Sequence, residues 1–74
     1  MDLNELGQKL NEMYFSSEEG AAVAMIHLFA IKYAEDIRAT GRSMKDIAKA
    51  GGINESYGTE ISKGVKLANY VIPK

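Results

Sequence analysis

Hydrophobic residues recur along most of the chain at the spacing of α-helices, and not with the alternation of β-strands. In the first segment they stand three or four positions apart, which places them on one face of a helix. They are Leu3, Leu6, Leu10, Met13 and Tyr14. Asp2 precedes this segment and Glu5 follows three positions later, which is the spacing of a capping box. The pattern predicts a first helix over residues 3–15.

The most apolar part of the chain predicts its longest helix, over residues 18–40. Ser16 and Glu19 have capping-box spacing at its start, and Gly41 suits the left-handed conformation that ends many helices. Its apolar side chains cover more than one face. They are Ala22, Met25, Ile26, Phe29, Tyr33 and Ile37, widened by Val23, Ala30 and Ala34. Such a helix lies at the centre of a domain or meets a partner. We expect a core position, with a homodimer through residues 18–40 as a second expectation.

Two shorter helices follow, separated by glycine. Ser43 has cap spacing with Asp46 and predicts a helix that starts there and stops at Gly51-Gly52. Asn54 is a candidate cap for a helix over about residues 54–67, and residues 70–72 before Pro73 favour an extended end. We therefore expect one all-α domain over residues 1–74, a small bundle of four or so helices.

Charge and composition narrow the classes of function. The chain has no cysteine, which excludes disulfides, a thiolate nucleophile and cysteine-ligated metals. The net charge of −1 is the sum of an acidic half and a basic half: residues 1–37 carry a net charge of −5 and residues 38–74 a net charge of +4. Such asymmetry hints at nucleic-acid contact by the basic half, although a short chain also divides unevenly by chance.

Residues 44–63 have the spacing of two helices that meet at a tight turn. Ala48 is small enough for a close crossing, Gly52 four positions later tolerates a positive φ, and Ile53 supplies an apolar plug beneath the turn. This stretch resembles the helix-turn-helix unit of DNA-binding domains, over about residues 43–64.

Two positions depart from that family. Gly58 stands where the second helix usually carries Ile or Val, and Gly51 replaces a larger apolar residue. Glycine inside a helix costs about 1 kcal/mol relative to alanine. Gly58 and Gly64 are therefore expected to weaken the second helix, unless they permit close approach of another backbone or of a ligand.

The resemblance implies that the second helix of the unit enters the major groove of DNA. It assigns base reading to Asn54, Glu55, Ser56, Thr59, Glu60 and Lys63. It places nearer the phosphates Arg42, Ser43, Lys45, Lys49 and Lys66. The implied function is a DNA-binding module, either a small transcriptional regulator or the DNA-binding part of a larger nuclease or regulator. Residues 56–71 are also similar to helix-turn-helix-like modules that accompany restriction-type nucleases.

Two observations keep an alternative open. Glu55 and Glu60 would repel phosphate, so weak DNA binding is expected unless a dimer doubles the contact surface. Asn54 also serves simply as a cap, and the lysines serve equally as a solvated face. The alternative function is a protein-interaction or dimerisation module that has helix-turn-helix geometry and does not bind DNA.

No combination of residues predicts an enzyme, a metal site or a cofactor site. His27 is the only histidine and lies among apolar residues, which favours a packed or half-exposed helix position. The adjacent acidic pairs at residues 18–19 and 35–36 point about 100° apart on a helix and do not converge on a substrate.

The start of the chain lacks the positive charge and apolar stretch of a secretory signal. Its most apolar run, residues 21–31, is also shorter than the roughly 20 residues that span a bilayer. A cytoplasmic protein that does not insert into membranes is expected.

Overall fold

The structure is a computed structural model, and it describes residues 1–72. This part of the chain forms five α-helices and one 3-10 helix, and it contains no strand, which confirms the expected all-α fold. The elements are α1 (Leu3–Phe15), α2 (Ala22–Lys32), α3 (Ala34–Thr40), α4 (Met44–Ala50), η1 (Glu55–Tyr57) and α5 (Gly58–Leu67).

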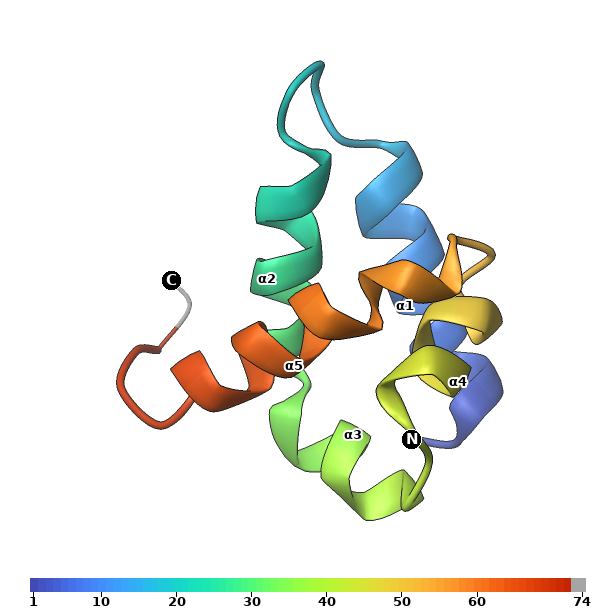
Figure 1. The fold of residues 1–74 in the computed structure, drawn as a ribbon, viewed down its shortest axis with the longest axis vertical. Helices are drawn as coiled ribbons and strands as arrows, with labels where there is room; N and C mark the ends of the chain where they lie inside the picture. Colours follow the sequence, from blue (N-terminus) through green and yellow to red (C-terminus); the bar gives the residue numbers. More distant parts are fainter. Residues whose placement is uncertain (73–74) are drawn as a thin grey trace.

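The helices enclose one hydrophobic core. In Figure 1, α1 and α2 stand side by side, α4 lies against α1, and α5 crosses in front of α2. The largest fully buried side chains come from all five α-helices. They are Leu6, Leu10, Ile26, Phe29, Ile37, Ile47 and Ile61. The core therefore joins the N-terminal helices to the later pair, α4 and α5. No helix within residues 1–72 is both long enough and apolar enough to cross a membrane.

The expected helix caps at Asp2 and Ser43 are present. The Asp2 carboxylate accepts from the Glu5 backbone N–H at 2.8 Å, and the Glu5 side chain accepts from the Asp2 N–H, which completes the capping box. The Ser43 hydroxyl accepts from the backbone N–H of Asp46 at 3.1 Å. Both caps satisfy N–H groups that have no partner within the first turn of a helix.

The expected helix start at residues 16–19 is wrong. The Ser16 hydroxyl donates back to the carbonyl of Glu12 and so belongs to the end of α1. Gly20 adopts φ +82°, a left-handed conformation that interrupts any helix, and α2 begins only at Ala22.

The expected single helix over residues 18–40 is also broken in its second half. Tyr33 has φ −110° and ψ 21°, outside the helical region, and separates α2 from α3. Residues 30–36 contain neither glycine nor proline, so packing decides the break. The bend buries Ile37 and lets Arg38 donate to the carbonyl of Val65 in α5 at 3.3 Å. The expected cap at Gly41 is confirmed, with φ +65°.

The last helix of the described chain begins with a 3-10 turn and ends in a tight turn. Residues expected to start an α-helix at Asn54 instead form η1, and α5 follows from Gly58. Tyr70, expected to be extended, lies in a turn because its N–H donates to the carbonyl of Leu67 at 2.9 Å. Val71 and Ile72 have no regular secondary structure, and Pro73 lies outside the described residues.

Candidate nucleic-acid interface

The two helices α4 and α5 meet at the turn that the sequence predicts. Gly52 adopts φ +73°, a conformation that a side chain would strain. Ile53 follows, is almost fully buried, and donates its N–H to the carbonyl of Ala48 at 3.2 Å. Ala48 itself is fully buried at the crossing. The turn is held from outside as well, because the Asn11 amide of α1 donates to the Gly51 carbonyl at 3.0 Å.

Gly58 allows the start of α5 to lie directly against the start of α4. A Cβ at this position would stand 3.0 Å from the backbone nitrogen of Lys45 and 3.1 Å from the carbonyl carbon of Met44. Gly51 is confined in the same way, since its Cβ would stand 2.6 Å from a methyl carbon of Leu10. Both departures from the family pattern therefore have a packing reason.

Gly64 likewise allows α5 to lie directly against α2. Its Cβ would stand 2.5 Å from the Cβ of Ala30 and 2.8 Å from the carbonyl oxygen of His27. The sequence allowed either another backbone or a ligand to approach these glycines closely. At Gly58 and at Gly64 the structure shows the backbone of another helix of the same chain. α5 is seated on α2 on one side and on α4 at its start.

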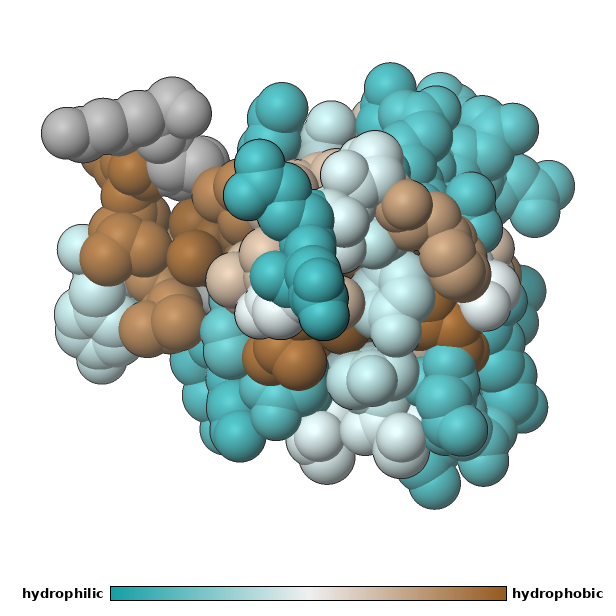
Figure 2. All heavy atoms as spheres, turned by 90° about the horizontal axis from the view of Figure 1, so that it is seen from above, coloured by the Kyte–Doolittle hydropathy of each residue, from teal (hydrophilic) through white to brown (hydrophobic). Residues whose placement is uncertain are grey.

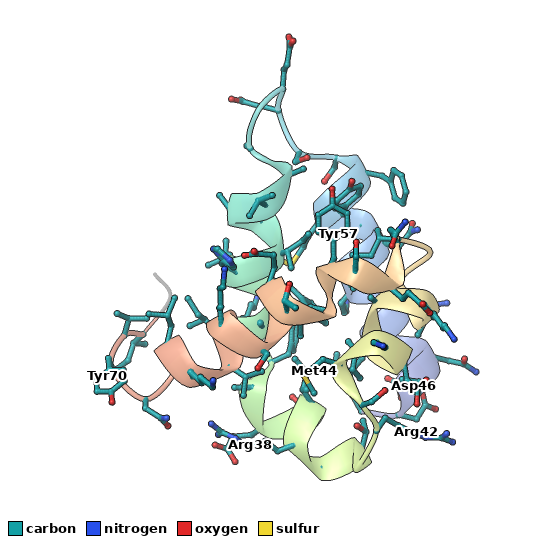
Figure 3. All side chains as sticks on the ribbon, viewed as in Figure 1. Arg38, Arg42, Met44, Asp46, Tyr57 and Tyr70 are labelled. Carbon is teal, nitrogen blue, oxygen red and sulfur yellow. The ribbon has the colours of Figure 1, made fainter. Side chains whose placement is uncertain are left out.

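A groove of about 340 Å³ lies between the start of α4 and the start of α5. Its lining residues are Ser43, Met44, Lys45, Glu55, Ser56, Gly58, Thr59 and Ser62. The groove therefore unites five candidates from both implied sets, base reading and phosphate contact. Met44, labelled in Figure 3, points into the bundle and packs against the core.

Ser62 was missed by sequence reasoning, although it lines this groove. Its spacing offered a signal, because it stands three positions after Thr59 and shares a side of the helix with it. Lys63 and Lys66 are exposed on the same helix. The outer side of α5 therefore carries hydroxyl and ammonium groups along its length.

Local hydrogen bonds occupy polar side chains at the groove and beside it. Asn54 caps η1, with its side-chain oxygen accepting from the Ser56 N–H at 2.9 Å. The Thr59 hydroxyl donates to the Ser56 carbonyl at 3.1 Å. Each retains hydrogen-bonding capacity: the Asn54 amide keeps both of its donors, and the Thr59 hydroxyl keeps its acceptor lone pairs.

Six of the eleven candidate residues, Arg42 and Lys49 among them, are not lining residues of the groove. Arg42 lines a separate hollow formed with residues 1–4 and 39–40, and Figure 3 shows its side chain pointing outward from the loop before α4. Lys49 stands at the far end of α4, where its Nζ lies 3.3 Å from the Glu55 carboxylate. Of the phosphate candidates, Ser43 and Lys45 are the ones at the groove.

Some charged side chains of the helix-turn-helix unit form ion pairs, whereas others among the described residues do not. Glu55 faces Lys49, and Glu60 faces Lys63 at 3.1 Å. Within residues 1–72, three exposed cations of this region take part in no ion pair. They are Arg42, Lys45 and Lys66. Both glutamates that would repel phosphate are thus partly neutralised, and positive charge remains on the unit.

Glu60 has a second partner outside the unit. Its carboxylate oxygen lies 2.6 Å from Nε2 of His27, which reaches it from α2. This hydrogen bond, followed by that from Lys63, lowers the pKa of the Glu60 carboxyl below its ordinary value. The half-exposed helix position expected for His27 is observed, with 30% of its side chain exposed. Its contact with Glu60 joins residues 33 positions apart and could not be found from spacing.

One of three comparisons with known proteins gives a match, and it agrees with this geometry. No curated protein and no solved structure gives a significant match to the chain. The family model described as an HTH-like domain matches residues 2–74. With α4, the Gly52 turn and α5 arranged as a helix-turn-helix inside a small all-α bundle, the chain belongs to the family of HTH-like domains.

Proposed function

We propose that this protein is a DNA-binding helix-turn-helix module in which the start of α5 enters the major groove. The observation that carries the proposal is the groove between α4 and α5, which gathers hydroxyls from both helices beside Lys45. Hydroxyl and ammonium groups are the donors that proteins use on phosphates and base edges. The role is one of binding and not of catalysis, in the cytoplasm, within a small transcriptional regulator or as the DNA-binding part of a larger chain.

The side chains divide into two groups by position. Ser56, Thr59 and Ser62 belong to η1 and the first turns of α5, from which helix-turn-helix proteins contact base edges. Lys45 at the start of α4 and Lys66 near the end of α5 are exposed and unpaired among the described residues. These two lysines suit contacts with phosphates on either side of the groove.

Replacing both unpaired lysines, as in K45Q/K66Q, is expected to weaken binding to a random-sequence duplex about tenfold at low salt. Each lost phosphate contact reduces the slope of log affinity against log salt by about 0.9. The double variant should therefore show a salt slope about 2 units shallower than the wild type. Fluorescence anisotropy at two or more salt concentrations measures both quantities.

The matched control is K32Q, which removes an exposed lysine from α2. It changes the net charge by one unit without touching the groove, and we expect it to leave the salt slope unchanged. A loss of affinity per removed charge that is as large in K32Q as in K45Q/K66Q would mean that binding follows net charge alone. Absence of duplex binding by the wild type at low salt would refute the proposed function.

The second candidate function is self-association through α2, and exposed apolar side chains favour it. Val23 and Leu28 on this helix are 42% and 36% exposed, and neither belongs to the hydrophobic core. Figure 2 shows further hydrophobic residues gathered around the C-terminal segment. Leu67, Val71 and Ile72 are the exposed members there. Because α2 carries no acidic residue and only Lys32 as a full charge, two copies would bring few like charges together.

Sedimentation velocity tests this candidate directly. We expect the wild type to sediment as a dimer at high concentration and V23E/L28E to remain a monomer, because buried carboxylates without partners are costly. Phe15→Glu is the control, since Phe15 is 62% exposed but stands at the end of α1. A wild type that stays monomeric at all concentrations would contradict dimerisation through α2.

A further inference from the structure

His27 contacts the proposed recognition helix from outside the helix-turn-helix unit. Its ring lies 2.6 Å from one carboxylate oxygen of Glu60, while Lys63 holds the other at 3.1 Å. Only 22% of the Glu60 side chain is exposed, compared with 64% for Lys63. The carboxylate is therefore held against α2, and the ammonium group of Lys63 is the more exposed of the two groups.

The backbone around this contact leaves little freedom. Gly64 brings α5 so close to α2 that a Cβ would stand 2.8 Å from the His27 carbonyl oxygen. Glu60 precedes Gly64 by one helical turn and so faces α2 at the same crossing. Thr59 leaves the helix about 100° away from Glu60 and lines the groove. The crossing thus separates the carboxylate from the surface offered to DNA.

We propose that His27 is a positioning residue for DNA binding: it holds the Glu60 carboxylate against α2 and away from the phosphates of bound DNA. This inference rests on the proposed function. Without His27, the carboxylate is free to swing toward solvent and toward the phosphates that Lys63 would approach.

The charged groups that face His27 come from α5 and are Glu60 and, through Glu60, Lys63. α1 carries Glu5, Lys9 and Glu12, and α3 carries Glu35, Asp36 and Arg38. In the described part of the chain none of these six forms an ion pair with His27. α2 itself adds Lys32, which lies over the Tyr33 ring.

The Glu60 carboxylate carries its negative charge at neutral pH, because its pKa lies below its ordinary value.

The experiment measures duplex affinity by anisotropy for five chains: wild type, H27Q, H27A, E60Q and H27A/E60Q. H27Q keeps a donor near the position of Nε2 and should bind like the wild type. H27A should bind about threefold more weakly, because the freed carboxylate opposes the approach of phosphate by about the energy of one charge near the surface.

The double variant separates positioning from packing. If His27 acts through Glu60, H27A weakens binding in the wild-type background and has no effect in the E60Q background. Equal weakening in both backgrounds, or weakening by H27Q as large as that by H27A, would overturn the inference while leaving DNA binding intact. Absence of binding by every chain would instead refute the proposed function, and the inference with it.

A readout without DNA checks the contact itself. NMR titration of the Glu60 side-chain carboxyl should show its pKa rising toward the ordinary value in H27A, because the largest cause of the lowering is removed. An unchanged carboxyl pKa in H27A would also overturn the inference. Thermal unfolding followed by circular dichroism verifies that each variant is folded before binding is measured.

Discussion

Gly7→Ala is expected to lower the free energy of unfolding by about 3 kcal/mol, at the upper end of the usual cost of overpacking. A Cβ at Gly7 would stand 2.3 Å from the carbonyl oxygen of Ala50 and 2.9 Å from its Cβ. The obstacle is backbone, so α1 and α4 must move apart. The gain in helix propensity from glycine to alanine, about 1 kcal/mol, is too small to offset this movement. Urea unfolding followed by circular dichroism measures the change.

The neighbouring position supplies the control. Gln8→Ala alters an exposed residue of the same helix and is expected to leave stability within about 0.5 kcal/mol of the wild type. A domain of this size has roughly 5 kcal/mol of stability, so Gly7→Ala should leave a visibly populated unfolded state on mild heating. A Gly7→Ala variant as stable as Gln8→Ala would show that α1 and α4 do not pack as described.

Gly58→Val is expected to destabilise the fold by about 2 kcal/mol, although it restores a residue that is usual in helix-turn-helix units. The Cβ alone would lie 3.0 Å from the Lys45 nitrogen and 3.3 Å from the Met44 carbonyl oxygen. The two further methyl groups of valine have no room without separation of α4 from α5. Thermal unfolding of the variant, compared with the wild type, gives the size of the loss.

Gly58→Ala separates the two causes that act at this position. Its single methyl group meets a tight but not prohibitive contact, and the gain in helix propensity opposes the cost. We expect its stability to lie within about 1 kcal/mol of the wild type, well above that of Gly58→Val. A valine variant more stable than the wild type would mean that the family pattern, and not the observed α4–α5 contact, governs this site.

Local signals predicted much of the fold. The caps at Asp2 and Ser43, the left-handed Gly41 and the Gly52 turn each depend on a few neighbouring residues, and all are present. Tyr33 shows where such signals end. Nothing in its surrounding sequence marks a break, and the bend is decided by contacts that Ile37 and Arg38 make with other elements.

The candidate site was predictable to a similar degree. The resemblance located the unit, and the groove brings together Ser43, Lys45 and Ser56 from the two sets of candidates. The partners of the charged residues could not be predicted, because they lie across the bundle. Glu60 is the main case: spacing suggests a groove-facing carboxylate, whereas His27 binds it from 33 positions away.

The contact of backbones at Gly64 has a mechanical consequence. Flexible side chains usually separate packed helices and absorb small displacements, but here the methyl group of Ala30 and the main chain at His27 fill the space. The separation of α2 and α5 at this crossing therefore has little room to change. If both the proposed DNA binding and the pairing of two copies through α2 hold, the distance between the two α5 helices is set mainly by the interface, and the pair selects one spacing between half-sites on DNA.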